Sequence, residues 1–228
     1  MALVTPILLA VLYGLVMFQF SAWSTKRHLS QASKPLRDRD LDPQITAMAR
    51  ALDLPGIEVN LYEVDQINGL AAPDGRIFIT RGFYEQFRRG AVSGDEMASV
   101  IAHEMGHVAL GHTRRRMIDF SSQNAARTAL ALVLNRFLPF IGPMIANALM
   151  GLLAARLSRA DEYEADAYAS ALLVKAGIGT AGQKSLFSKL DKLTANRAGA
   201  VPAWLLSHPK SSERIAAIEA NEARWGTT

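Results

Sequence analysis

The residues best suited to catalysis lie in the stretch His103-Glu104-Met105-Gly106-His107. Four residues correspond to about 400° of rotation along an α-helix, so the two imidazoles project from one face and can share one ion. Imidazole nitrogens are typical zinc ligands, and Glu104, about 100° round the helix from His103, can take a proton from a water held by that ion. The pattern predicts a hydrolase with one Zn²⁺ held by His103 and His107.

Two histidines on a helix also fit an ordinary core or surface, which is the alternative to a metal site. The neighbouring side chains, Ala102 and residues 108–110, are apolar, so the helix is expected to be buried. Buried imidazoles and a buried carboxylate without a partner are energetically costly, and a metal ion removes that cost. The context therefore favours the metal.

A catalytic zinc normally takes three protein ligands and a water, so a further donor is required. His112 is close in sequence, but at about 100° per residue it lies about 180° around the helix from His103, and we predict that it cannot close the site. The best candidate is Glu162, in a helical pattern that starts at Ser158 and ends near Gly177.

Glu162 shares a helix face with Asp166, four residues later. We predict that Glu162 is the third ligand. Asp166 is then expected to accept a hydrogen bond from the distal nitrogen of a ligand histidine, which fixes the tautomer of that histidine. The alternative is a solvated acidic face paired with Arg159. Because the histidine pair needs a third donor, we favour the ligand interpretation.

Several elements must position these side chains. Ser93 and Glu96 have the spacing of a capping box, which predicts the start of a helix that runs toward Met117 and carries both histidines. Upstream, residues 57–64 alternate as a strand and residues 67–80 form a hairpin. The predicted fold class is α+β, mainly helical, with a small antiparallel sheet.

The first 25 residues carry no charged side chain and are almost wholly apolar. About 20 such residues suffice to cross a bilayer, so we predict a transmembrane helix over residues 1–25, with a cleaved signal peptide as the alternative. Residues 26–41 are the expected basic juxtamembrane linker. The positive-inside bias puts this linker and the catalytic domain, expected over residues 42–222, in the cytoplasm. A signal peptide would put them on the periplasmic or extracytoplasmic side instead.

A second apolar stretch, residues 128–155, separates the histidine motif from Glu162. The two halves of one metal site must lie on the same side of a membrane, which excludes an odd number of crossings between them. Two crossings need about 40 residues and only 28 are present, so we predict that the stretch does not span. We expect either a hairpin in the membrane interface, broken at Pro139 to Pro143, or helices packed over the catalytic domain.

Composition sets further limits. The 228 residues fit one domain, and the absence of cysteine excludes thiolate catalysis, cysteine-ligated metal sites and disulfides. The net charge of +4 suits nucleic acid in principle, but no basic stripe interleaved with aromatic residues accompanies it, so we predict no nucleic-acid partner. A membrane surface with anionic lipid attracts the same charge.

Four motifs together resemble the HtpX-like zinc metallopeptidases, metallopeptidase family forty-eight, which also includes the CAAX prenyl endopeptidases. They are the hairpin over residues 68–82, the histidine motif, the stretch from Glu162 to Asp166, and Ser207-His208-Pro209 with Arg214-Ile215. The resemblance spans about Asp42 to Ala220. It implies a membrane-associated, zincin-type endopeptidase with one Zn²⁺ per chain, the ligands His103, His107 and Glu162, and Glu104 as the base.

The same resemblance assigns roles outside the metal ligands. An edge strand that binds an extended polypeptide substrate through its backbone is formed by Asn68, Gly69, Leu70, Ala71 and Ala72. His208 either stabilises the oxyanion or occupies the water position in a latent state, and Arg214 lies near it. The alternative is a helix-capping turn around His208, with Arg214 bridging an acidic residue.

The expected function is that of a membrane-anchored metalloendopeptidase in quality control of misfolded or damaged membrane or envelope proteins. Its partners are then polypeptide substrates and the lipid bilayer. A zinc-stabilised membrane scaffold or chaperone that cleaves nothing is the alternative, although a purely structural site needs no base such as Glu104. A hydrolase of non-peptide substrates is a third hypothesis. The sequence predicts no oligomeric state.

Overall fold

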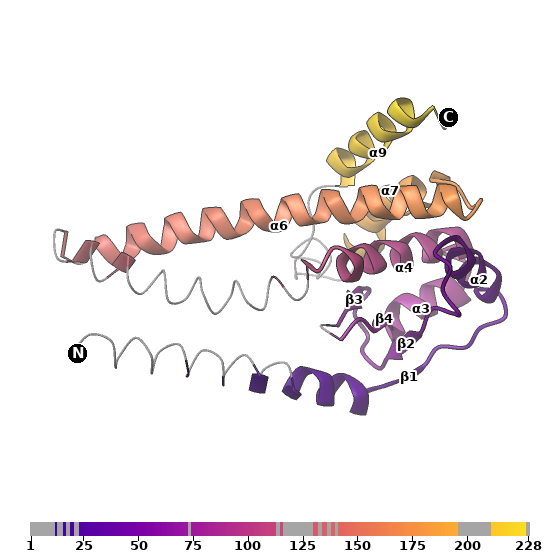
Figure 1. Cartoon of the computed structure of the whole chain (residues 1–228), viewed down its shortest axis with the longest axis horizontal. Helices are drawn as coiled ribbons and strands as arrows, with labels where there is room; N and C mark the ends of the chain where they lie inside the picture. Colours follow the sequence, from indigo (N-terminus) through magenta and orange to yellow (C-terminus); the bar gives the residue numbers. More distant parts are fainter. Residues whose placement is uncertain are drawn as a thin grey trace.

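The structure, a computed structural model, describes residues 23–72, 74–112, 141–195 and 211–226, with isolated positions between 12 and 20 and between 115 and 139. The described elements stack in layers (Figure 1). Helix α4 (Gly94–Ala109) lies against the sheet, and helices α6 (Gly142–Lys175) and α7 (Ala181–Ala195) pack on α4. Helix α9 (Ser211–Trp225) packs on α6 and α7. Helix α4 is therefore enclosed between the sheet and the other helices.

The sheet has four strands in the order β1-β2-β4-β3. Their bounds are β1 Ser33–Pro35, β2 Val59–Tyr62, β3 Gly69–Ala71 and β4 Ile77–Thr80. The predicted hairpin is confirmed, because β3 and β4 pair antiparallel with Leu70 opposite Phe78. The expectation of an antiparallel sheet is wrong, because β2 and β4 pair parallel. Strand β4 is buried along its whole length, and this explains why it takes a central position while β3 lies at the edge.

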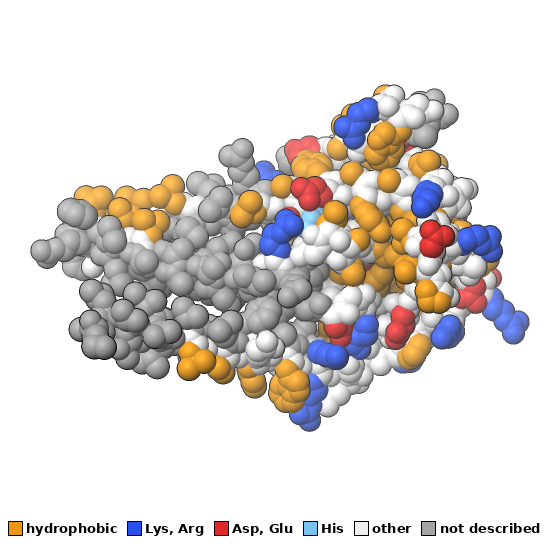
Figure 2. Space-filling view, viewed as in Figure 1, with side chains coloured by type: hydrophobic (Ala, Val, Ile, Leu, Met, Phe, Trp, Pro, Cys, Tyr) orange, Lys and Arg blue, Asp and Glu red, His pale blue; other side chains and the backbone are white. Residues whose placement is uncertain are grey.

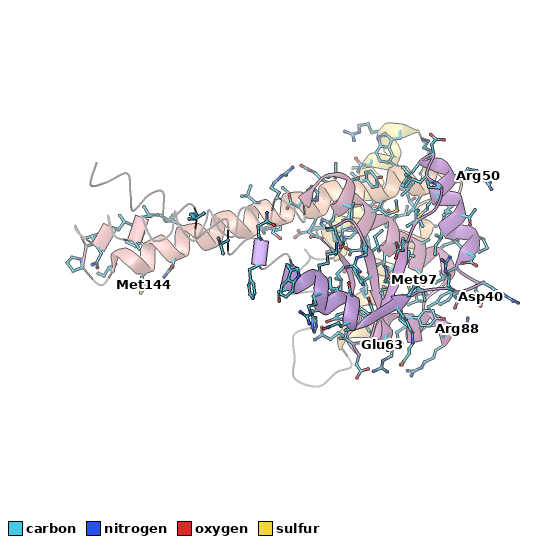
Figure 3. All side chains as sticks on the ribbon, turned by 60° about the horizontal axis from the view of Figure 1, so that its bottom comes forward. Asp40, Arg50, Glu63, Arg88, Met97 and Met144 are labelled. Carbon is cyan, nitrogen blue, oxygen red and sulfur yellow. The ribbon has the colours of Figure 1, made fainter. Side chains whose placement is uncertain are left out.

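Two short helices join the strands to α4. Helix α2 (Asp42–Ala51) has a proline in its first turn, where a missing N–H is tolerated, and α3 (Arg81–Arg88) directly follows β4. The chain before α2 is tied to α3, since Arg88 Nη1 donates to Asp40 Oδ2 at 2.9 Å (Figure 3). These links fix the sheet and its neighbouring helices as one unit.

The main core lies between the sheet and the helices. Met97 in α4 is fully buried within it (Figure 3). The large apolar side chains that surround it come from strands and helices far apart in the sequence and include Val59, Leu61, Ile77, Ile79, Phe83, Ile101, Leu173 and Leu186. Burial of these side chains is the main favourable contribution to the fold that positions α4.

The segment before β1 also packs on the domain. Residues 23–31 are helical, and Leu29 forms a separate small cluster with Ala72 and Phe78 of the hairpin. Strand β1 then pairs antiparallel with β2. A strand inside the expected linker, residues 26–41, was not predicted.

Helix α6 is one continuous helix of 34 residues, about 50 Å long at 1.5 Å per residue. Its C-terminal half packs on α4, while its N-terminal half leaves the domain as an arm, with Met144 near the far end (Figures 1 and 3). Apolar side chains are exposed along this arm (Figure 2). They include Ile141, Met144, Ile145, Leu149 and Leu157. The part of residues 128–155 that lies in α6 thus extends away from the domain, while much of the rest of the stretch lies outside the described residues, so both expectations for the whole stretch stay predictions.

The membrane predictions stay predictions. None of the helices in the described part of the chain is both long and apolar enough to span a bilayer. Most of the predicted transmembrane helix, residues 1–25, lies outside the described residues.

Candidate metal centre

Helix α4 begins at the capping box predicted from the sequence. Ser93 Oγ accepts from the Glu96 N–H at 3.2 Å, and the Ser93 N–H donates to Glu96 Oε2 at 2.8 Å. Lys189 and Ser185 of α7 also donate to the Glu96 carboxylate. Burial raises the pKa of Glu96, but the hydrogen bonds from Lys189, Ser185 and Ser93 outweigh it and hold the pKa below its ordinary value. A charged carboxylate thus locks the start of α4 onto α7.

The three predicted ligands meet where α4 crosses α6. The Nε2 atoms of His103 and His107 are 3.1 Å apart. Glu162 Oε2 lies 3.3 Å from His103 Nε2, and Glu162 Oε1 lies 3.4 Å from His107 Nε2. One donor atom from each residue lies within 4.8 Å of the other two, and all three side chains are buried. This geometry can hold one metal ion.

The chemistry of this donor set fits a cation. His103 Nδ1 lies 2.9 Å from Asp166 Oδ1, so it carries the proton of that contact, and His103 Nε2 then presents its lone pair to the centre. His107 likewise points its Nε2 at the centre and its Nδ1 at another side chain. Two nitrogen lone pairs and a carboxylate in a buried site need a positive partner, and Zn²⁺ is typically held by such ligands.

Asp166 and Arg214 orient His103 through its Nδ1 atom, on the side of the ring that faces away from the centre. Arg214 donates from Nε and Nη2 to the two oxygens of Asp166, each at 2.6 Å, and its guanidinium stacks 4.0 Å over Phe187. Burial raises the pKa of Asp166, but the charge of Arg214 outweighs it and lowers that pKa. Arg214 thus bridges an acidic residue that itself contacts a predicted ligand histidine. His208, which the resemblance pairs with Arg214, lies outside the described residues.

The site favours positive charge on the imidazole of His103. Burial alone lowers the pKa of His103, but the hydrogen bonds with Asp166 and Glu162 outweigh it and raise the pKa to about 9. The same negative potential that retains a proton in the absence of metal also attracts a divalent cation.

Sequence reasoning missed the position of His112. Helix α4 ends at Ala109, earlier than predicted, and Gly111 follows with a φ of 70°, so the helical angle does not extend to residue 112. His112 is buried, with its Nδ1 atom 3.0 Å from His107 Nδ1 and its Nε2 atom 3.2 Å from Glu164 Oε2. His112 does not belong to the three-residue donor group, although the reason given by helical periodicity was wrong. The glycine just before it was the available signal.

Gly106 allows α4 and α6 to approach closely enough for the three predicted ligands to meet. A Cβ atom at this position would lie 3.0 Å from both the Cα and the carbonyl oxygen of Ala165. Because Ala165 lies between Glu162 and Asp166 in α6, any separation of the helices moves both carboxylates away from the histidines. The glycine inside the histidine motif therefore has a packing role.

Gly69 brings the edge strand β3 against the same helix. A Cβ atom there would lie 2.7 Å from Val100 Cγ1 and 3.2 Å from Glu104 Oε1. The segment predicted to bind substrate thus lies beside Glu104. Asn68 and Ala72 flank β3, which lies at the end of the strand order.

A cavity of about 500 Å³ opens on another face of α4. It is bounded by Met105 and Val108, by the hairpin turn and by the loop after α2. Met105 lies about 200° round the helix from His103, so this cavity is separate from the metal centre.

Comparisons with known proteins bear on the whole domain. The family model described as peptidase family M48 matches residues 35–222. The metalloprotease LoiP of Escherichia coli is 33% identical over 175 residues, which are 75% of this chain and 66% of that protein. The metalloprotease YcaL of Escherichia coli is 30% identical over the same shares of both chains. The protease HtpX of Shewanella halifaxensis is 25% identical over an alignment of 247 positions, which covers 88% of this chain and 82% of that protein. The chain thus spans just under two thirds of the length of LoiP and YcaL.

Proposed function

Because the chain belongs to peptidase family M48, we propose that it is a zinc-dependent metalloendopeptidase whose metal centre consists of His103, His107 and Glu162. The matched range contains all three residues. The observation that carries the proposal is the convergence of two imidazole nitrogens and a carboxylate oxygen, buried and within 4.8 Å of one another. Two histidines and a glutamate are a typical ligand set of catalytic zinc, which keeps one position open for water. We assign one ion to each chain.

The chain's own residues then perform the proton transfers. When bound, Zn²⁺ supplies a Lewis acid that polarises the peptide carbonyl and lowers the pKa of a water molecule. Glu104, buried next to the first histidine, takes a proton from this water and later gives a proton to the leaving amine. Asp166 and Arg214 act through His103, because their hydrogen bonds keep its Nε2 directed at the centre.

We further propose that residues 68–72 bind the substrate as an added strand. In the sheet as described, β3 pairs only with β4, so its outer edge can bind the backbone of an extended polypeptide. Backbone recognition accepts many sequences and does not require a chain end, which suits an endopeptidase. Gly69 holds this edge beside Glu104, next to which the scissile bond would lie.

The proposed setting is a membrane, with an anchor over residues 1–25, a linker over 26–41 and the peptidase domain over 42–222. Large apolar side chains are exposed at the described positions of the first segment and on the arm of α6, whereas charged side chains gather around the domain (Figure 2). A lipid surface is a partner that covers such side chains. We propose the cytoplasmic side for the domain, and misfolded or damaged membrane or envelope proteins as substrates.

The decisive experiment combines metal content with proteolysis of casein by the purified full-length chain. We expect cleavage that a chelator abolishes and added zinc restores. Glu104→Gln should abolish cleavage while zinc stays bound, and His103→Ala should lose both. Glu219→Gln, on the exposed face of α9, is the control with the same chemical change and should retain both. Zinc bound without any cleavage, in the wild-type chain as well as in Glu104→Gln, would instead indicate the scaffold or a hydrolase of non-peptide substrates.

Sidedness has its own test. A reporter fused after Thr228 that is active only in the cytoplasm should give a signal. A signal only from a reporter active outside the cytoplasm would refute the proposed orientation without affecting the metal centre.

A further inference from the structure

The two ligand histidines have different partners at their distal nitrogens. His103 is held by the carboxylate of Asp166, the usual kind of partner for a ligand imidazole. His107 is held by a second imidazole, because its Nδ1 atom lies 3.0 Å from Nδ1 of His112. His112 itself is not one of the three donor residues.

The end of α4 gives His112 this position. The helix is capped at Leu110, and the positive φ of Gly111 turns the chain, so that residue 112 folds back toward His107. The His112 side chain is fully buried, and the two rings meet edge to face with centroids 5.2 Å apart. A buried, closely packed imidazole has few rotamers available, so it can fix the orientation of its neighbour.

The proton positions along this contact follow from the direction of the ligand nitrogen. If Nε2 of His107 presents a lone pair to the metal, its Nδ1 carries the proton and donates it to His112. Nδ1 of His112 is then an acceptor, so Nε2 of His112 carries the proton. That atom lies 3.2 Å from Glu164 Oε2, a carboxylate oxygen that accepts it. Both hydrogen bonds therefore run in the same direction: His107 donates to His112, and His112 donates to Glu164.

We propose that His112 is a positioning residue of the metal centre, which fixes the ring orientation and tautomer of His107 through a hydrogen-bond chain that ends on Glu164. This inference rests on the proposed zinc site. It adds a function for a histidine outside the ligand set and connects the metal to the surface, since Glu164 is exposed. Asp161, whose Oδ1 atom lies 3.8 Å from His112 Nε2, adds negative charge on the same side.

The test measures the zinc affinity of the full-length chain by competition with a chromogenic chelator, and the melting temperature without metal. His112→Phe keeps the ring and removes the acceptor, and we expect zinc to bind about 10- to 100-fold more weakly. His112→Asn keeps an acceptor oxygen near the position of Nδ1, so it should bind zinc roughly threefold to tenfold more tightly than His112→Phe. His28→Phe, a histidine outside the site, is the control and should match the wild type.

A second variant covers the case in which His112→Phe does not fold. Glu164→Ala removes the exposed carboxylate at which the hydrogen-bond series from His107 ends, without changing the core. It should weaken zinc binding by roughly twofold to tenfold. Glu219→Ala is its exposed control on α9 and should have no effect.

The outcomes separate this inference from the proposed function. Unchanged zinc affinity in His112→Phe, or in Glu164→Ala where the former is unfolded, would overturn the positioning role alone. Equal loss in His112→Phe and His112→Asn, or a lower metal-free melting temperature with normal zinc affinity, would show that His112 only packs. A wild-type chain that binds no zinc would refute both the metal site and the role of His112.

Discussion

Substitution of Gly106 by alanine tests whether the close crossing of α4 and α6 assembles the metal centre. The added Cβ atom would lie 3.0 Å from the Cα and the carbonyl oxygen of Ala165. These are backbone atoms, which cannot rotate away. Such contacts are tighter than ordinary van der Waals contacts, so the helices must separate by a few tenths of an ångström at this point.

That separation is large for a metal site. Ligand distances in a functional site are held to about 0.2 Å, and Glu162 comes from the helix that must move. We expect weaker zinc binding and a loss of peptidase activity of about tenfold or more, because a displacement of about 1 Å costs about 100-fold and this shift is a fraction of that distance. Overpacking destabilises a fold by roughly 1–3 kcal/mol, and the better helix propensity of alanine offsets about 1 kcal/mol of this. The fold should therefore survive with a net loss of about 0–2 kcal/mol.

Gly151→Ala is the matched control. This glycine lies in α6, and a Cβ atom there would meet nothing within 4 Å. Its variant should be slightly more stable and fully active, because only helix propensity changes. The assays are zinc affinity by chelator competition, casein cleavage, and the urea midpoint of unfolding. Unchanged zinc affinity and activity in Gly106→Ala would refute the argument that this crossing sets the ligand geometry.

Three further predictions concern the surroundings of the centre. Gly69→Val should push β3 away from Glu104 and lower kcat/KM for a peptide substrate by about tenfold or more, while zinc content by mass spectrometry stays constant. Arg214→Met should lower the free energy of unfolding, measured in urea, by roughly 3–5 kcal/mol, because Asp166 stays buried without its cation; an effect below about 1 kcal/mol would contradict this. The pKa of Glu96 is lower in the folded chain than the value of about 4.3 expected when the chain is unfolded. The charged Glu96 therefore stabilises the fold fully above about pH 4.3, and this stabilisation is lost as the pH falls through the pKa of the folded state. The loss of stability between pH 6 and acid, followed by urea unfolding, should be smaller in Glu96→Gln; equal losses would argue against a stabilising charge.

The fold was predictable where structure is local. The capping box at Ser93 and the hairpin that becomes β3 and β4 depend on neighbouring residues, and both are present as expected. The parallel pairing of β2 with β4 was not predictable, because it depends on which strand is buried on both faces. The continuity of α6 from the apolar arm to the metal centre was also missed, since an apolar run does not reveal whether it ends before the next helix begins.

The sequence by itself determined the types of the donor side chains and the relative placement of the two histidines. The spacing of His103 and His107 gives one helix face with two imidazoles, because helical periodicity is a property of the local backbone. Only the tertiary structure decided how close Glu162 comes, that Gly106 is the contact which allows it, and that His112 turns back onto His107. These contacts join positions 5 to 59 residues apart, and they depend on the packing of whole helices and on one glycine beyond a helix end, which no local pattern specifies.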